Sequence, residues 1–229
     1  WTPNIYGGKE NLAAVELFKH INSIIKKRGL DIMLIARESA AWPCVTGNVS
    51  TGLGFDYKWN NGWLKELFDF MKLDPIYRKD RYNQLVFSMI YNYSEKFILA
   101  LPKDAFADYG YSMLNMMPGS DEEKFASVKA ALGYTFLHPA KKLISDSVCN
   151  MDDNNKLNNY VKELNNLYRS NPELHELDYD PDGFEWINNF SANETVVIFC
   201  RKSSEGGHLI AAVNFTPVVR KNYKIGVPY

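Results

Sequence analysis

The sequence predicts an α/β fold built on a parallel sheet and followed by a small antiparallel β-domain. Two observations carry this prediction. Helical patterns alternate with short apolar runs, which are typical of strands buried on both faces of a parallel sheet. Near residue 171 the pattern changes to strand-like segments separated by Asn, Ser and Gly turns. We therefore predict one domain over residues 1–171 and a second over residues 172–229.

The predicted helices carry apolar residues three and four positions apart. The first includes Leu12 to Ile25 and ends in a basic turn before Gly29, a residue that suits a helix C-terminus. Further helices are predicted over residues 59–71, 124–137 and 157–168. These helices separate the apolar runs, as expected where each strand is followed by a helix.

Four short apolar segments are the predicted parallel strands. They are Ile32–Ala36, Phe55–Tyr57, Phe97–Leu101 and Lys142–Ser145, and the antiparallel strands are predicted at 184–187, 195–200 and 208–215. The sequence leaves open whether the parallel sheet is open or closed into a barrel. In either fold, functional residues lie on loops that follow the carboxyl ends of the strands. We therefore expect them directly after Ala36 and after Leu101.

Composition and charge exclude several classes of protein. The formal net charge is -1, so no basic surplus indicates a nucleic-acid partner. No stretch approaches the roughly 18 apolar residues of a membrane span. The three cysteines are far apart and odd in number, which argues against a disulfide framework and a zinc site. We expect reduced thiols in a cytoplasmic protein, with no metal and no cofactor. The start at Trp1 indicates a piece of a longer protein or the removal of an upstream part.

Ordered motifs along nearly the whole chain carry a family resemblance. They include WTPNIYGGKENL at 1–12, GLGFDYKWN at 52–60, LDPIYR at 73–78, HPAKKL at 138–143, GFEW at 183–186 and NFTP at 214–217. The chain resembles the C-terminal half of bacterial-type 1,4-α-glucan (glycogen) branching enzymes of the α-amylase clan. The resemblance implies the second half of a (β/α)8 barrel followed by part of an antiparallel β-domain. It also implies cleavage of an α-1,4 glucan and its re-attachment through an α-1,6 bond, by a retaining mechanism with two carboxyl groups.

The resemblance is incomplete at the catalytic positions. It places the family's nucleophilic Asp upstream of the first motif, and therefore outside residues 1–229. The acid/base Glu of the family's AEES motif corresponds to Arg37, within Ala36–Ser39. A guanidinium has no carboxyl proton to donate. Glu38 is adjacent, but neighbouring side chains on a strand face opposite ways. We expect that the chain alone does not catalyse branching; whether Arg37 has a new contact or reflects drift stays open.

The remaining candidate site residues also come from the resemblance. Asp104 keeps the acid that holds sugar hydroxyls in the family, and it is the candidate catalytic residue. Lys103 replaces the neighbouring His of the family's SHDE motif. Lys103, Trp42 and Trp59 are candidate substrate-binding residues. The two tryptophans could cover sugar rings or pack in the core, and Asp104 could be an ordinary polar residue at a strand end.

Two classes of function stay open at this point. The first is a branching-enzyme-like protein or fragment whose parent activity transfers α-glucan chains. The second is a non-catalytic glucan-binding or scaffold protein with the same fold. The expected ligand of either is an α-glucan. Half of a barrel exposes two sheet edges and an apolar interior face. We therefore also expect a missing N-terminal half, or self-association, to cover this surface.

Overall fold

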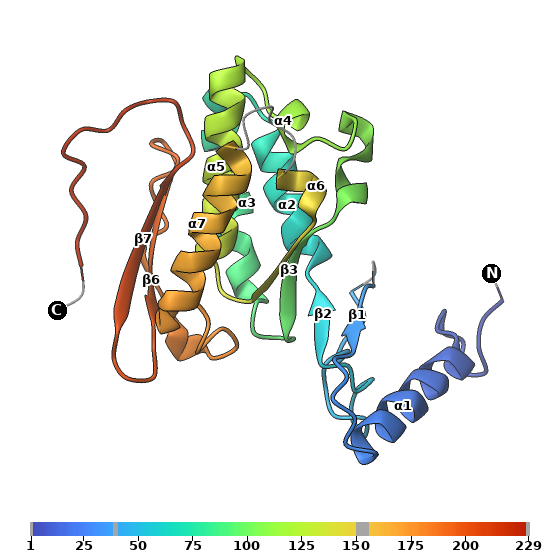
Figure 1. Ribbon diagram of the computed structural model, residues 1–229. Helices are drawn as coiled ribbons and strands as arrows, with labels where there is room; N and C mark the ends of the chain where they lie inside the picture. The colour runs from blue at the N-terminus through green and yellow to red at the C-terminus, as the bar shows by residue number, and fades with distance from the viewer. Residues whose placement is uncertain (1, 39–40, 150–155, 228–229) are drawn as a thin grey trace. The chain divides into compact units, whose positions relative to one another are not determined.

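The computed structural model describes residues 2–38, 41–149 and 156–227 (Figure 1). They divide into two compact units. The first comprises the residues up to Trp59 together with Ser94–Ile98, and the second comprises Asn60–Tyr93 and the residues from Leu99 onward. Trp1 and Ser39, which belong to two of the family motifs, lie outside the described residues. No helix in the described ranges is long and apolar enough to cross a membrane.

Helices and strands alternate along the first two thirds of the chain. The α-helices are α1 (Leu12–Lys27), α2 (Asn61–Met71), α3 (Asn83–Val86), α4 (Met113–Met116), α5 (Asp121–Leu137), α6 (Asp146–Cys149) and α7 (Lys156–Ser170). The strands are β1 (Ile35–Ala36), β2 (Tyr57–Trp59), β3 (Phe97–Leu101), β4 (Lys141–Ile144), β5 (Phe184–Asn188), β6 (Val196–Lys202) and β7 (His208–Asn214). Short 3-10 helices η1 (Pro75–Arg81), η2 (Phe87–Ile90), η3 (Lys103–Tyr109), η4 (Pro172–Leu174) and η5 (Pro181–Gly183) complete the set.

The strands form two sheets, as the sequence predicts. The first is a parallel sheet with the order β1-β2-β3-β4. Its register places Ala36 opposite Lys58 and Lys58 opposite Phe97. The second sheet is antiparallel, with the order β5-β6-β7. The fold class is therefore confirmed: the second half of a barrel is followed by part of a β-domain. The boundary at residue 171 stays a prediction.

The first predicted strand is wrong in length and in burial. β1 comprises two residues instead of Ile32–Ala36, and the side chains of Ile32 and Met33 are 50% and 63% exposed. The N–H of Leu34 donates to the Asp56 carboxylate at 2.8 Å instead of continuing a strand ladder. In the sheet order β1 is the edge strand, next to β2. An apolar run is buried only where neighbours cover it on both sides.

Local hydrogen bonds set the ends of the helices. Asn11 caps α1, because its side chain accepts the Ala14 N–H at 3.1 Å. After α1, Gly29 adopts a φ of 60°, which the sequence predicts for a glycine at this place. α5 begins three residues before the predicted start at Lys124. Ser120 and Glu123 form a capping box there, in which each side chain binds the other residue's backbone N–H.

Two buried arginines join the antiparallel sheet to the helices of the second unit. Arg78 in η1 is 1% exposed and donates to the carbonyls of Met71, Leu73 and Phe215, at 3.0, 3.1 and 2.7 Å. Arg201 in β6 is fully buried and contacts Asp178 at 2.9 Å. It also donates to the Leu137 carbonyl at the end of α5, at 2.9 Å. Each guanidinium therefore links the antiparallel sheet to the layer of helices in the second unit.

His138 lies in the apolar core of this unit. Its Nε2 is 3.1 Å from the Ser88 hydroxyl, and its Nδ1 is 3.0 Å from the Pro139 carbonyl oxygen. The rings of Trp63 and Tyr134 lie against it. Burial lowers the pKa of His138 to about 3, although the Pro139 carbonyl acts in the opposite direction. The imidazole therefore stays neutral in the folded protein at ordinary pH.

The low pKa of His138 predicts a loss of stability in acid. An unfolded His takes up a proton near pH 6.5, whereas folded His138 does not until about pH 3. Its contribution is fully present above pH 6.5 and falls by about 1.4 kcal/mol per pH unit as the pH drops through that window. His138→Gln should remove this part of the slope in urea unfolding between pH 7 and 4.5.

The exposed residue His208 provides the matched control. His138→Gln should change the slope of unfolding free energy against pH more than His208→Gln does, because His138 is the buried histidine of the two. Equal slopes for wild type and His138→Gln would contradict the buried, neutral imidazole.

Candidate functional site

The two residues that follow β1 point to different partners on β2. The Arg37 guanidinium lies over the Trp59 ring, 4.7 Å from the ring centre. The Glu38 carboxylate lies 3.2 Å from the Lys58 ammonium. Lys58 and Trp59 are adjacent on a strand, so their side chains belong to opposite faces. The opposite orientation that the sequence predicts for Arg37 and Glu38 agrees with these contacts.

Glu38, Lys58 and Trp42 form a closed ring of polar contacts. The Lys58 ammonium donates to the Trp42 carbonyl at 2.9 Å, and the Trp42 N–H donates to the Glu38 carboxylate at 3.3 Å. Lys58 is only 7% exposed. A buried ammonium needs such partners, because removing it from water without them is costly. Glu38 therefore serves as a fixed acceptor in the ring, and it positions the backbone of Trp42.

The two candidate tryptophans are both half-buried. One face of the Trp59 ring is covered by Arg37, so a sugar could stack on that face only if the guanidinium moved away. Trp42 is held through its backbone, which leaves the orientation of its ring to the packing around it. Glucan stacking by either tryptophan stays a prediction.

A buried glutamate that the sequence analysis missed holds the loop after Trp42. Glu95 accepts the N–H groups of Val45 and Thr46 at 2.7 and 2.8 Å, and it also binds the Thr46 hydroxyl. Glu95 is 9% exposed. Its contacts join residues about fifty positions apart, which no local pattern indicates. The only signal was a pair of charged residues, Glu95 and Lys96, before the apolar run that forms β3.

Lys103 and Asp104 open the η3 turn in the second unit. They follow the carboxyl end of β3, where the sequence predicts functional residues. Both side chains are exposed, and the fully buried Phe106 anchors the turn beneath them. The Lys103 ammonium lies 5.1 Å from the centre of the Tyr111 ring. Asp104 is thus accessible to a ligand, and its role as a sugar-binding acid stays a prediction.

The structure brings together some of the predicted residues and adds new ones. Arg37 contacts Trp59. The backbone of Trp42 takes part in the closed set of polar contacts with Glu38 and Lys58. Lys103 contacts Tyr111, which the sequence analysis did not select. Among residues 2–38, 41–149 and 156–227, no group of three or more His, Cys, Asp or Glu side chains could hold a metal ion.

The polar ring predicts that Lys58 keeps Trp42 in place. Lys58→Met removes the donor to the Trp42 carbonyl and the ion pair between Lys58 and Glu38. The Trp42 amide should then exchange with solvent deuterium about tenfold faster or more, which corresponds to the loss of one hydrogen bond to a charged group. Native-state hydrogen exchange read by NMR measures this.

The control is an exposed lysine with an ion pair of its own. Lys65 pairs with Asp69, and its side chain is 77% exposed. Lys65→Met should leave exchange at Trp42 unchanged, because exposed pairs contribute little. Unchanged exchange at Trp42 in a folded Lys58→Met variant would show that the ring does not position the loop.

Comparison with known proteins gives a match to one protein family and several relatives that match this chain along its whole length. Residues 186–229 match the family described as Alpha amylase, C-terminal all-beta domain. The 1,4-alpha-glucan branching enzyme GlgB 1 of Clostridium perfringens (strain 13 / Type A) is 41% identical over 100% of this chain and 37% of its own length. GlgB of Halothermothrix orenii is 40% identical over 100% of this chain and 39% of its own length. The chain therefore spans less than half the length of these relatives.

Solved structures show the same fold at low identity. A pullulanase from Paenibacillus barengoltzii, in complex with maltohexaose and alpha-cyclodextrin, matches with a TM-score of 0.60 and 13% identity, over 89% of this chain and 39% of that protein. An alpha-amylase from Geobacillus thermoleovorans, complexed with acarbose, matches with a TM-score of 0.55 and 13% identity, over 88% and 46%. These matches agree with a partial barrel followed by a β-domain.

Proposed function

Because the chain is homologous along its whole length to the carboxyl-terminal part of 1,4-α-glucan branching enzymes of the α-amylase clan, we propose that it is the glucan-handling part of such an enzyme. The observation that carries this proposal is 41% identity over the entire chain to a relative of which it covers only 37%. On this proposal, the parent activity is transfer of an α-1,4 glucan chain to an α-1,6 branch point, and the 229-residue chain does not perform it alone.

The contacts after β1 support the absence of activity in the chain alone. A retaining mechanism needs one carboxylate as nucleophile and one carboxyl as acid/base. The acid/base position is taken by Arg37, whose guanidinium contacts Trp59. Glu38 faces the other way and is engaged with Lys58 and the Trp42 N–H. Arg37 has no carboxyl proton to donate, and Glu38 could serve as the proton donor only if it left Lys58 and the Trp42 N–H.

The alternative function is a non-catalytic glucan-binding or scaffold protein. It has less support, because each relative reported above is named as a branching enzyme and matches over the full chain. In both cases the proposed ligand is an α-glucan; the proposed contacts are Trp42 and Trp59 in the first unit and, separately, Lys103 and Asp104 in the second. The proposed location is the cytoplasm, which suits the free thiols of Cys44 and Cys200.

The first test is an activity assay on the 229-residue chain. Incubation with amylose should produce no new α-1,6 bonds, because acid/base catalysis alone contributes roughly 10² to 10⁴-fold and the nucleophile adds to it. Enzymatic debranching followed by chain-length analysis measures the branch points. Arg37→Glu alone should also be inactive. A rise in branch points with either protein would overturn this part of the proposal.

A second test concerns what covers the first unit. On α1, Phe18 and Ile21 are 44% and 40% exposed; Met33, before β1, is 63% exposed, and Ile35 in β1 is 39% exposed. In the sheet order β1 is the edge strand, next to β2. Exposed apolar surface beside an unpaired strand edge favours association. We propose that an N-terminal barrel half, or a second copy of the chain, covers this surface.

Co-expression with the segment that precedes the matched region in the Clostridium perfringens relative should give a stable complex. Light scattering after size exclusion measures its mass. Met33→Asp should weaken the complex, whereas the control Lys9→Asp, on the exposed segment before α1, should not. A monodisperse monomer that does not bind the added segment would contradict the proposal that another polypeptide covers this surface.

A further inference from the structure

A buried carboxylate in the second unit collects hydrogen-bond donors from several elements. Asp178 is 1% exposed. One of its oxygens accepts the Ala140 N–H at 3.2 Å and the Nη2 of Arg201 at 2.9 Å. The other accepts the Nζ of Lys141 at 3.0 Å and the Tyr168 hydroxyl at 3.0 Å. Asp178 therefore joins the turn before β4 to β6 and α7, and the function proposed above leaves this cluster without a role.

Lys142 lies in the same cluster, where it contacts carbonyl groups and an aromatic ring. Its side-chain nitrogen donates to the His138 carbonyl at 2.7 Å and also to the Ala140 carbonyl. The same nitrogen lies 4.7 Å from the centre of the Tyr168 ring. A neutral lysine amine keeps two N–H groups, so it can bind both carbonyls without carrying a charge. These contacts therefore hold the turn before β4 even when Lys142 has lost its proton.

Among the described residues of this cluster, one carboxylate faces three cations. They are Arg201, Lys141 and Lys142, so two positive charges are in excess when all four groups are ionised. A guanidinium does not lose its proton in a protein, and Lys141 pairs directly with the Asp178 carboxylate. Removing an uncompensated charge from water is costly. Lys142 is therefore the cation that the cluster holds least well.

The other titratable groups beside the cluster do not balance this excess. They are Tyr93, Tyr168, Tyr179, His138 and His175. None of these five side chains is a carboxyl group. Burial and the charge of Asp178 raise the pKa of Tyr168, so its hydroxyl stays neutral. The charge on Lys142 therefore depends on Asp178, which favours it, and on Arg201 and Lys141, which oppose it.

Lys142 changes its charge in a pH range that follows from these contacts. Burial, assisted by the neighbouring cations, lowers the pKa of Lys142 to about 7. A solvated lysine has a pKa of about 10.4. Between these values Lys142 is neutral inside the cluster and charged outside it. Each pH unit of acidification in this window thus favours the outward form about tenfold, and the effect ends below pH 7 because the inward form is then protonated too.

The turn that Lys142 holds has an unfavourable backbone conformation. Ala140 adopts a φ of 106°, in the region that favours glycine. Such a conformation persists only where the surrounding structure holds it. Asp178 binds the Ala140 N–H, and Lys142 binds the Ala140 carbonyl. This turn connects α5, which ends at Leu137, to β4, so the loss of Lys142 would release the backbone between a helix and a strand.

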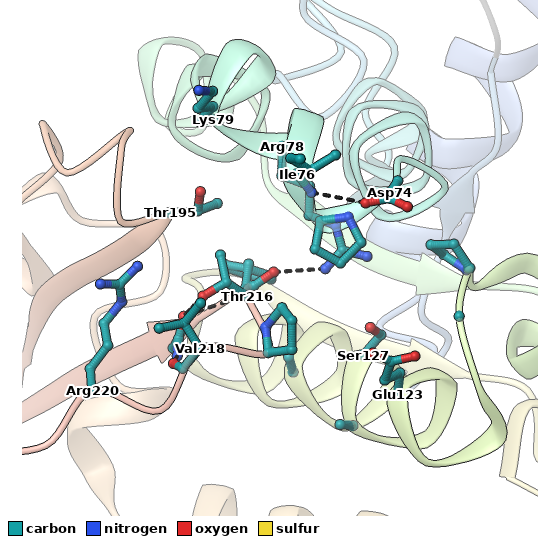
Figure 2. Close-up of a pocket in the computed structure, with 18 of the residues that line it drawn as sticks. Asp74, Ile76, Arg78, Lys79, Glu123, Ser127, Thr195, Thr216, Val218 and Arg220 are labelled. Carbon is teal, nitrogen blue, oxygen red and sulfur yellow. Dashed lines mark hydrogen bonds between the residues drawn. The ribbon is translucent and has the colours of Figure 1, made fainter.

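The pocket of the second unit lies apart from this cluster. Its walls come from η1, the first half of α5 and the turns that flank β6 and β7 (Figure 2). Asp178, Arg201, Lys141 and Lys142 are not among the residues that line it. A ligand in the pocket would therefore not neutralise the excess charge, and the cluster has to relieve it through its own residues.

We infer that Lys142 is a proton-controlled latch on the turn between α5 and β4. Its neutral amine holds the carbonyls of His138 and Ala140 inside the cluster, and its protonation drives the side chain out to solvent and releases the turn. The excess charge of the cluster falls when the ammonium leaves, and Ala140 is then able to leave its positive φ. The inference concerns the second unit alone and does not depend on the proposed function.

An NMR titration of the 229-residue chain, labelled with carbon-13 at the lysine Cε atoms, tests the charge of the latch. The Lys142 signal is identified by its disappearance in Lys142→Met. It should titrate with a midpoint near pH 7 in the wild type. A midpoint close to that of a solvated lysine, about pH 10.4, would overturn the inference, because the amine would then not be neutral in the cluster.

Hydrogen exchange at the Ala140 amide tests the release of the turn. The protection factor is the intrinsic exchange rate at each pH divided by the observed rate. In the wild type it should rise about tenfold per unit between pH 7 and pH 9, as the open form becomes rarer. Lys142→Met has no amine to titrate, so its protection factor should not depend on pH. Lys142→Arg stays charged and should show low protection throughout this range.

The matched control is a lysine that also lies over a tyrosine ring. The Lys129 nitrogen is 4.8 Å from the centre of the Tyr160 ring, but Lys129 is exposed. Lys129→Met should keep the wild-type dependence of Ala140 protection on pH. A wild-type protection factor that does not change with pH would show that Lys142 titrates without releasing the turn. A pH dependence that survives in Lys142→Met would assign it to another group, and either result overturns the inference.

Discussion

The second unit depends on burying two guanidinium groups with all of their partners in place. A charged group removed from water is tolerated only when hydrogen bonds and opposite charge replace the lost hydration. Arg201 meets this condition through Asp178, whose second carboxylate oxygen binds Lys141 at 3.0 Å and the Tyr168 hydroxyl at 3.0 Å. Arg78 meets it through three backbone carbonyls, together with the charge of Asp74. These partners come from both layers, so neither layer can shift without leaving a buried charge unpaired.

This constraint explains why the antiparallel sheet belongs to the same compact unit as the helices. β6 carries Arg201 and Phe199, and Phe199 contacts Tyr134 of α5 edge to face. Tyr134 also packs against Phe215, whose carbonyl accepts a hydrogen bond from Arg78. Apolar packing and charge pairing therefore act at the same junction. The pocket lies beside this junction, and the same contacts keep its walls in place.

Local sequence patterns predicted an element well where the surrounding structure supplied the burial that the pattern requires. β3 has the predicted bounds, and all five of its residues are buried, because strands on both sides cover it. β1 has the same apolar pattern but only one neighbouring strand, so most of the predicted run is exposed. Periodicity reports which residues prefer burial. It does not report whether the structure supplies a cover.

The candidate site could be predicted only in part, for a related physical reason. The places of Arg37 and Asp104 after strand ends followed from the alternation of helices and strands together with the family motifs. Lys58 and Glu95 were missed, because their partners lie between 16 and 50 positions away in the chain. The pocket gave no signal at all. This pocket, of about 700 Å³ in the second unit, has walls from four separate stretches, at 74–79, 118–130, 193–195 and 214–220. The hydrogen bond from Arg78 to the Phe215 carbonyl joins two of them.

After β1, the residue at position 37 determines which group lies beside Trp59, and the carboxylate of the neighbouring Glu38 cannot replace it. Two neighbouring side chains leave a strand on opposite faces, so Arg37 and Glu38 cannot exchange places. Glu38 is also required where it is, because Lys58 is buried and depends on it. A carboxylate recruited from Glu38 to the opposite face would leave that ammonium without its ion pair. Of these two positions, it is therefore position 37 that faces Trp59, and the guanidinium that occupies it keeps one face of Trp59 covered.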